Sequence, residues 1–245
     1  THYKERMARI LSIETGTEVC SVALAQDGEL ISLRESGAEG REHANKLGLY
    51  IDEVLRENGM DADELDAVAV GGGPGSYTGL RIGVSTAKGL CYALGRPLIA
   101  VDSLQALANI AMEEYAAGIV EIEDPTRALL APMIDARRME VYTRLFDTAL
   151  TPQGEAAAHI LTSESFAEVF AAGRELLVFG NGAQKCLDLL PRARFARVAS
   201  SARGLVTLAE TAFQARNFVD TAYYEPYYLK DFVVNPNRRN LLMRS

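Results

Sequence analysis

Two acidic residues stand at matching points in the two halves of this chain, each at the end of an apolar run. Glu14 precedes a Thr-Gly-Thr turn at residues 15–17, and Asp135 precedes a turn at residues 137–139. Magnesium accepts carboxylate ligands together with nucleotide phosphates, and glycine lets a backbone approach a phosphate closely. These residue types would suit a magnesium nucleotide held between the halves. The second turn lacks a glycine, so retained scaffold turns remain the competing interpretation.

The densest glycine pattern lies at residues 71–79, directly after the apolar run of residues 67–70. Five of these nine residues are glycine and one is proline, and a helical pattern follows. N–H groups at such a helix start can bind an anion. A Walker phosphate loop, however, carries Lys and then Ser or Thr after its last glycine, whereas Gly79 is followed by Leu80 and Arg81. The segment is therefore a glycine turn of another kind.

Cysteines and histidines are few and scattered. The cysteines form no Cys-x-x-Cys pair, which indicates reduced, buried thiols; they are Cys20, Cys91 and Cys186. The histidines are His2, His43 and His159. His43 stands at a predicted helix start, where the neighbouring Glu42 suits the helix dipole, so a capping or partner-contact role competes with a catalytic one. We expect no metal and no cofactor.

Apolar periodicity predicts the elements that position these residues. The first half reads as strands at residues 8–14, 19–26 and 29–35, a helix at 42–58, a strand at 67–71, the helix after the glycine turn and a strand at 97–101. The second half reads as strands at 128–135 and 140–147, a helix at 163–171, a strand at 176–179 and helices at 183–190 and 202–217. The Ile-Glu and Glu-Val pairs around the first hairpin return as Ile-Asp and Glu-Val around the second.

This order predicts an α/β protein with a duplicated βββαβα plan, which is the architecture of the actin-like ATPase (ASKHA, ribonuclease H-like) fold with two subdomains. We place the subdomains at residues 7–105 and 106–220, and an aromatic and basic tail at residues 221–245. In this architecture paired hairpins face each other across a cleft. The turn at residues 180–183 would lie at that cleft, where weak nucleotide binding is one open possibility.

Bulk composition limits the function classes. The chain has 245 residues, of which 48% are hydrophobic and 24% charged, as in ordinary globular proteins with a substantial core. A net charge of -8 argues against strong autonomous nucleic-acid binding. No apolar run reaches the roughly 18 residues of a membrane span, and no signal peptide is visible, so we expect a cytoplasmic protein. Residues 1–6 are polar and are interpreted as a leader or upstream extension.

Five segments, in order, resemble the bacterial TsaB (YeaZ) family: residues 9–24, 41–43, 71–95, 134–142 and 225–229. The glycine turn with the following Leu-Arg-Ile-Gly is the most diagnostic. The resemblance implies a role in making threonylcarbamoyladenosine, a tRNA modification beside the anticodon. It also implies a heterodimer with the catalytic paralogue TsaD, a ternary complex with the ATPase TsaE, a homodimer when alone, and only indirect contact with tRNA.

The resemblance further implies that this chain is not the catalyst. TsaD-type enzymes place a metal-binding His-x-Glu-Gly-His segment after the strand that follows the glycine-turn helix. Here Ser103 and Leu107 stand at the histidine positions and Gln105 at that of the glutamate. Because leucine cannot coordinate a metal, we expect no catalytic or metal-binding residues.

Members of this family meet TsaD, or a second copy of themselves, through the two helices of the first half. One helix carries an apolar stripe and the other has small residues four apart, and the candidate partner-binding residues are Leu47, Tyr50, Ile51, Val54, Leu80, Gly83, Val84 and Ala87. Packing against the sheet needs the same pattern and remains the competing interpretation. If the residues face a partner, Leu47→Asp should abolish pairing without unfolding the chain.

The tail and the fold each leave alternatives open. The aromatic residues 222–229 and the basic residues beyond them would suit stacking on tRNA, although such tails more often pack on their own protein. An actin-like kinase or ATPase with its own magnesium-nucleotide site is the main alternative function. A second alternative is a metallopeptidase, which would need a metal site. A third is an interaction scaffold outside tRNA modification, which would differ from the accessory role only in the partners that it binds.

Overall fold

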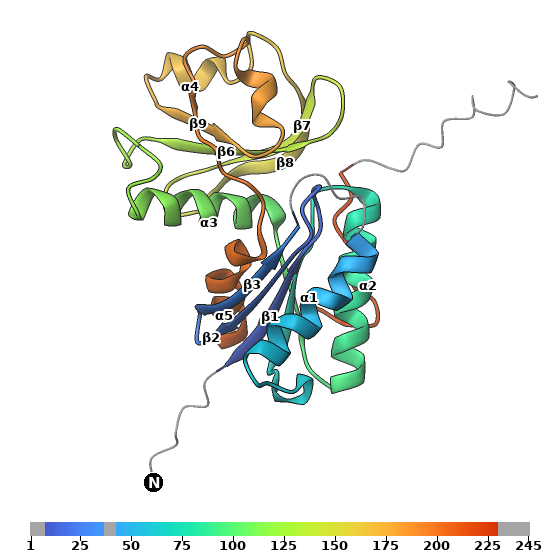
Figure 1. The fold of residues 1–245 in the computed structure, drawn as a ribbon. Coiled ribbons are helices and arrows are strands. Elements are labelled where there is room, and N and C mark those ends of the chain that lie inside the picture. Colours follow the sequence, from blue (N-terminus) through green and yellow to red (C-terminus); the bar gives the residue numbers. More distant parts are fainter. Residues whose placement is uncertain (1–7, 37–42, 230–245) are drawn as a thin grey trace, which may run out of the picture.

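A computed structural model describes residues 8–36 and 43–229. Two five-stranded mixed sheets form two lobes, one above the other in Figure 1. In the N-terminal lobe the order is β3-β2-β1-β4-β5, with β1, β2 and β3 antiparallel and β4 and β5 parallel to β1. The bounds are β1 Arg9–Glu14, β2 Ser21–Gln26, β3 Glu29–Glu35, β4 Ala67–Gly71 and β5 Leu98–Val101.

The C-terminal lobe repeats this topology. Its sheet has the order β10-β9-β6-β7-β8, which is the same arrangement read from the other edge. The bounds are β6 Leu129–Asp135, β7 Glu140–Phe146, β8 Pro152–Ile160, β9 Leu176–Phe179 and β10 Arg194–Phe195. Since each lobe has three antiparallel strands followed by two parallel ones, the predicted duplication is confirmed.

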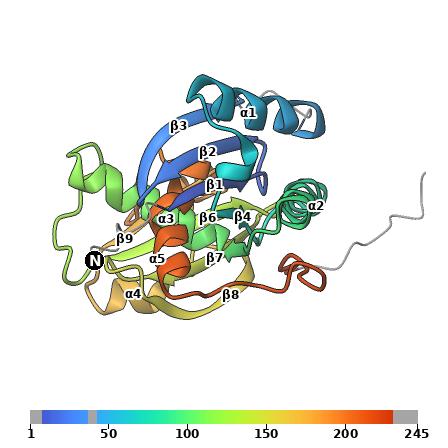
Figure 2. The same cartoon turned by 90° about the horizontal axis from the view of Figure 1, so that it is seen from below.

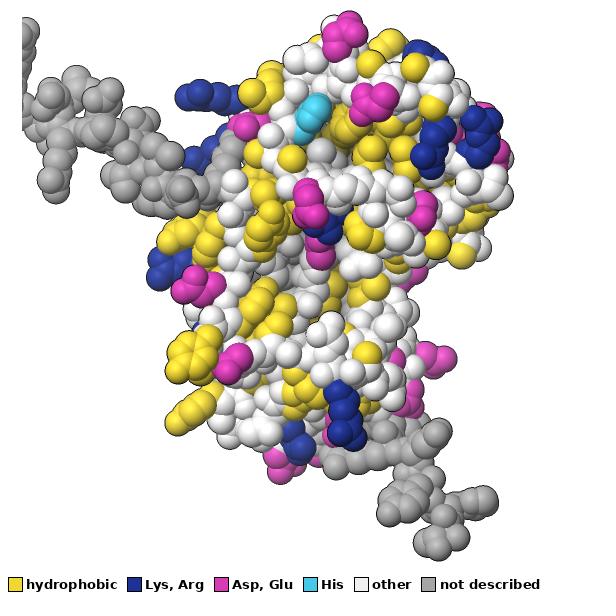
Figure 3. All heavy atoms as spheres, turned by 180° about the vertical axis from the view of Figure 1, so that it is seen from behind, with side chains coloured by type: hydrophobic (Ala, Val, Ile, Leu, Met, Phe, Trp, Pro, Cys, Tyr) yellow, Lys and Arg dark blue, Asp and Glu magenta, His cyan; other side chains and the backbone are white. Residues whose placement is uncertain are grey.

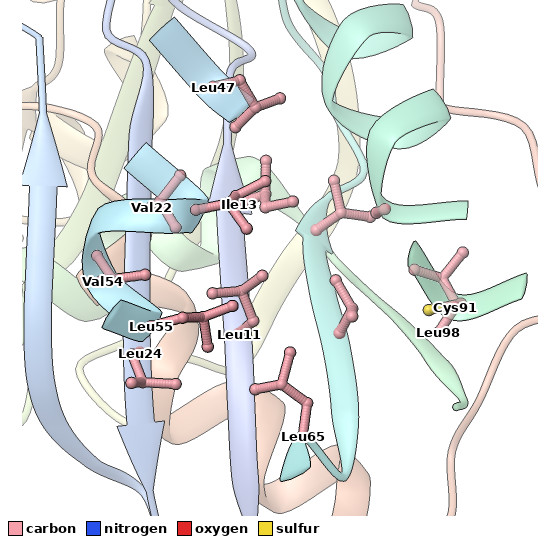
Figure 4. Close-up of a cluster of buried hydrophobic side chains, with 14 of the residues drawn as sticks. Leu11, Ile13, Val22, Leu24, Leu47, Val54, Leu55, Leu65, Cys91 and Leu98 are labelled. Atoms are coloured by element: carbon pink, nitrogen blue, oxygen red, sulfur yellow. The ribbon is translucent and has the colours of Figure 1, made fainter. Parts of the chain in front are cut away.

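Two long helices cover one face of the N-terminal sheet. They are α1, His43–Glu57, and α2, Tyr77–Leu94, whose first turn is capped by Ser76. The apolar stripe of α1 is buried against β1 and β2, where Leu47 and Val54 meet Ile13 and Val22 (Figure 4). Burial of this stripe is the main driving force that holds α1 on the sheet.

The lobes exchange their last helices. Helix α3, Ser103–Ala116, follows the N-terminal strand β5, yet Leu104 and Ile110 are buried in the core of the C-terminal lobe. In return, a short 3-10 helix, Ala202–Leu205, and α5, Val206–Gln214, cover the N-terminal sheet on the face opposite α1 (Figure 2). Residue 105 lies in the first turn of α3. The division into 7–105 and 106–220 stays a prediction.

Several predicted elements differ from the structure. The helix expected at 163–171 is only α4, Ala167–Ala171, because Phe166 has a left-handed φ of 62° and Ser165 accepts a hydrogen bond from the Thr162 N–H in the preceding turn. The segment 183–190 contains a short 3-10 helix, Ala183–Cys186, and 202–217 is split as described. Neither α3, β8, β10 nor the 3-10 helix Ala62–Glu64 was predicted as an element.

Some predicted features fall on residues that lie outside the part of the chain described by the structure. These are residues 1–7, residues 41–42 with the side chain of His43, and the basic part of the tail from residue 230. Within residues 8–36 and 43–229, no helix combines the length and the apolar character needed to cross a membrane.

Candidate functional site

The glycine turn lies directly on the first hairpin. The Ser76 N–H donates to the Gly16 carbonyl at 2.7 Å, and the Thr15 hydroxyl donates to the Gly79 carbonyl at 2.8 Å. A Cβ atom on Gly79 would collide with the Thr15 carbonyl oxygen. Glycine is therefore required here so that the backbone of the turn can approach the chain's own hairpin.

Glu14 is enclosed beneath this turn and is only 2% exposed. Its Oε1 accepts a hydrogen bond from the Gly16 N–H at 2.7 Å, and its Oε2 accepts one from the Ser103 hydroxyl at 3.0 Å. Burial raises the pKa of the Glu14 carboxyl, and the bonds from Gly16 and Ser103 oppose that rise. The first of the two predicted carboxylates is thus a buried structural group.

The second predicted carboxylate, Asp135, has a different setting. Its side chain is 45% exposed and its Oδ1 lies 2.6 Å from the Lys185 ammonium. The same oxygen accepts a hydrogen bond from the Arg137 N–H, while the Asp135 N–H donates to Asn181. The structure therefore joins Asp135 to the turn after β9 and gives it an ion-pair partner from its own lobe.

A pocket of about 350 Å³ lies where the lobes meet. The N-terminal lobe contributes Thr17 and Glu18, and the C-terminal lobe contributes the turn at residues 180–181 and the segment 195–200. The Asn181 amide donates to the Glu18 carboxylate and so links the two sides. Neither Glu14 nor Asp135 lines this pocket, so the structure does not bring the predicted carboxylates together there.

The segment that stands in the place of the TsaD metal motif packs into the protein. The Ser103 hydroxyl donates a hydrogen bond to Glu14, and the Gln105 amide donates one to the Leu150 carbonyl. Leu107 is 1% exposed and lies in the core of the C-terminal lobe. Among the described residues, no group of three or more His, Cys, Asp or Glu side chains is placed to hold a metal ion.

Sequence reasoning missed the role of Asp102 and Ser103. Asp102 caps α3 by accepting the Leu104 N–H at 2.8 Å, and its other oxygen accepts a 2.9 Å bond from Arg144 on β7. Burial raises the pKa of Asp102, and the Arg144 charge opposes this. An Asp-Ser pair directly after an apolar strand is a helix-start signal that would have indicated α3.

Most of the candidate partner-binding side chains are enclosed within the chain. Tyr50 is partly buried, and the others are buried, namely Leu47, Ile51, Val54, Leu80, Gly83, Val84 and Ala87. Most of them pack α1 and α2 on the sheet, whereas Leu80 lies beside Gly16 and Gly73. A role in partner binding stays a prediction, and any direct contact on these helices would involve their exposed residues.

The duplicated sheets and the exchanged helices define the actin-like ATPase, or ASKHA, fold class. The solved structure of YeaZ from Pseudomonas aeruginosa superposes with a TM-score of 0.75 at 27% identity, covering 91% of this chain and 100% of that chain. A family model described as TsaD, tRNA N6-adenosine threonylcarbamoyltransferase, matches residues 38–169.

Two relatives carry the name tRNA threonylcarbamoyladenosine biosynthesis protein TsaB. The Escherichia coli protein is 32% identical over 92% of this chain and 96% of its own length. The Haemophilus influenzae protein is 38% identical over 54% of this chain and 51% of its own length. The chain belongs to the TsaB (YeaZ) family.

Proposed function

We propose that this chain is an accessory subunit in the biosynthesis of threonylcarbamoyladenosine in tRNA, and that it binds and activates the catalytic TsaD subunit together with TsaE. The observation that carries the proposal is the alignment with the E. coli TsaB protein along nearly the whole of both chains. The match of residues 38–169 to the TsaD family model supports a paralogous pair.

The packing around the glycine turn supports a role without catalysis of its own. Glu14 is enclosed, and Ser103 is its hydrogen-bond partner. Leu107, at a position where TsaD-type enzymes carry a metal-binding histidine, offers no donor atom and fills the core. The chain would therefore act by binding TsaD.

The exposed face of α1 and α2 is the proposed platform for TsaD and, in its absence, for a second copy. On α2 the exposed residues recur at helical spacing, with Arg81, Ser85, Gly89 and Tyr92 on one stripe. Tyr92 is 88% exposed, and Leu49 on α1 is 53% exposed. Aromatic side chains of this kind are common anchors of protein interfaces. The eight buried or partly buried candidates would hold this face in place.

The kinase or ATPase alternative would need both lobe carboxylates available to a magnesium nucleotide. Glu14 is buried under the turn, and Asp135 is paired with Lys185. These two observations favour the accessory role.

Size-exclusion chromatography with light scattering, on the chain alone and mixed with its cognate TsaD, tests the proposal. We expect a homodimer that gives way to a one-to-one heterodimer. Tyr92→Glu should weaken the heterodimer at least about tenfold, or about 1.4 kcal/mol. Ile119→Glu, a matched change at a residue that is 72% exposed outside both helices, should leave it intact. No complex between the wild-type chain and TsaD would overturn the proposal.

A further inference from the structure

The described part of the tail runs back along the N-terminal lobe. The Val219 N–H donates to the Leu98 carbonyl at 3.0 Å, so the tail begins as a bridge on the edge strand β5. Lys88 on α2 then donates to the carbonyls of Ala222 and Tyr224, both at 3.0 Å. Val219 thus attaches the chain to β5, and the residues that follow, 222–229, called the strap from here on, are attached to α2. Figure 3 shows the molecule from behind. Apolar side chains protrude at its left edge, where α2 and the described part of the tail lie.

The strap fits the outer face of the glycine turn. The Tyr227 N–H donates to the Gly72 carbonyl at 2.8 Å. A Cβ atom on Gly72 would collide with the Tyr224 hydroxyl oxygen, and one on Gly73 would lie 2.6 Å from the Tyr227 carbonyl oxygen. Two of the glycines thus leave room for the strap, which covers the turn from outside while the hairpin at residues 14–16 supports it from inside.

The strap also contacts both lobes. Tyr224 packs against the core cluster of the N-terminal lobe, and Leu229 packs against that of the C-terminal lobe. Between them the Tyr228 ring lies 4.8 Å from the Tyr77 ring, at the first residue of α2. One short segment therefore joins the glycine turn, the start of α2 and the second lobe.

We propose that the strap is a releasable latch: docked on the glycine turn, it fixes the turn and the angle between the lobes, and when released it lets both move. Two hydrogen bonds connect the glycine turn to the start of α3: the Gly73 N–H donates to the Ser103 hydroxyl, and the Ser103 N–H donates to the Gly73 carbonyl. Because α3 packs in the C-terminal lobe, loosening the turn would also loosen this link between the lobes. The latch acts in the chain alone and does not depend on the proposed partner.

A compensating pair of substitutions in the full chain tests the latch. Gly72→Ala places a methyl group against the Tyr224 hydroxyl and should displace the strap. Adding Tyr224→Phe removes that oxygen and leaves the ring carbon that carried it at 3.5 Å, an ordinary contact, so the strap should dock again. Tyr223→Phe, at a neighbouring tyrosine that is 85% exposed, is the matched control and should not restore docking.

Two readouts are needed. The first is amide hydrogen exchange at Tyr227, Gly73 and Ser103, which we expect to be at least about tenfold faster in Gly72→Ala and restored in the double variant. The second is the distance between spin labels at Arg56→Cys on α1 and Glu168→Cys on α4, which should broaden and recover in the same way. The native cysteines are buried and would stay unlabelled.

The latch is overturned if faster exchange is confined to Tyr227 while Gly73, Ser103 and the label distance keep their wild-type values. It is also overturned if Tyr224→Phe fails to restore them. If Gly72→Ala does not fold, Tyr224→Ala against Tyr223→Ala answers the same question, since only the first should loosen the turn.

Discussion

The two lobes share one strand order but differ in what covers it. In the N-terminal lobe the helices after β3 and β4 have 15 and 18 residues, whereas their counterparts after β8 and β9 have 5 and 4. The matching carboxylates differ too, because Glu14 is buried under its turn and Asp135 is paired with Lys185 at the surface. The two sheets are alike, but the long helices with an exposed face lie on the N-terminal lobe, because α3, the 14-residue helix that packs on the C-terminal lobe, is mostly buried.

The largest expected effect tests which residues of helix α1 lie in the core and which lie on the surface. Leu47 is 1% exposed, so Leu47→Asp should reduce the free energy of unfolding by at least about 4 kcal/mol, because it buries a charge in a packed site. This replaces the sequence-based expectation that the variant stays folded. Leu49→Asp, two residues away and 53% exposed, should change stability by less than about 0.5 kcal/mol. Urea unfolding measures both, and equal losses would contradict the assigned faces.

The next effect compares the two glycine turns. Gly79→Ala drives a methyl group into the Thr15 carbonyl and should cost about 1–3 kcal/mol. Gly182→Ala should cost less, because its new methyl group would lie 2.8 Å from a Val141 methyl group and 3.1 Å from the backbone, whereas that of Gly79→Ala would lie 2.0 Å from the Thr15 carbonyl oxygen. As a control, Gly89→Ala meets nothing within 4 Å and should stabilise α2 by about 0.5–1 kcal/mol. Thermal unfolding ranks the three, and a reversed order of Gly79 and Gly182 would mean that the C-terminal turn is the tighter one.

A smaller effect concerns the pH dependence of stability. Burial raises the pKa of Glu14 above its usual value of 4.5, so the folded state holds this proton more tightly than the unfolded chain. The resulting stabilisation is complete below about pH 4.5 and is lost as the pH rises through the raised pKa. Glu14→Gln should therefore remove part of the decline in stability above pH 4.5, whereas Ser103→Ala, which deletes a hydrogen bond to the carboxylate, should extend the decline to higher pH. Unfolding curves across this range are the measurement, and an unchanged slope in Glu14→Gln would refute the account of Glu14.

The smallest expected effect is at Asp135. Lys185→Met removes the ion pair but keeps most of the apolar stem, and should cost only about 0.2–1 kcal/mol because Asp135 is partly solvated. The difference from wild type should shrink at high salt. A loss of several kcal/mol in chemical denaturation would show that the C-terminal carboxylate is as structural as Glu14.

Much of the fold was predictable because the signals are local. The strands β4 and β9 were predicted with their observed bounds, since both are short, fully buried runs beside glycine turns. In contrast, β8 begins with proline and is largely exposed, so it lacks a clear alternation. Helix α3 begins at an Asp-Ser pair whose capping role depends on the side chain of Asp102, a signal that apolar periodicity does not carry.

The site was less predictable, for a tertiary reason. An apolar stripe on a helix indicates that one face is buried, but it does not indicate whether the chain's own sheet or a partner covers that face. Here the sheet covers Leu47 and Val54. Similarly, the carboxylate of Glu14 looked available in the sequence because its enclosure depends on Ser103 and the glycine turn, both distant along the chain.

We propose that the exposed face of α1 and α2 binds TsaD. The most direct test is hydrogen exchange of the chain alone and mixed with cognate TsaD. We expect that TsaD slows exchange in residues 46–57 and 78–93, while residues 183–190 of the C-terminal lobe keep their rates. Slower exchange in the C-terminal lobe with both helices unchanged would contradict it.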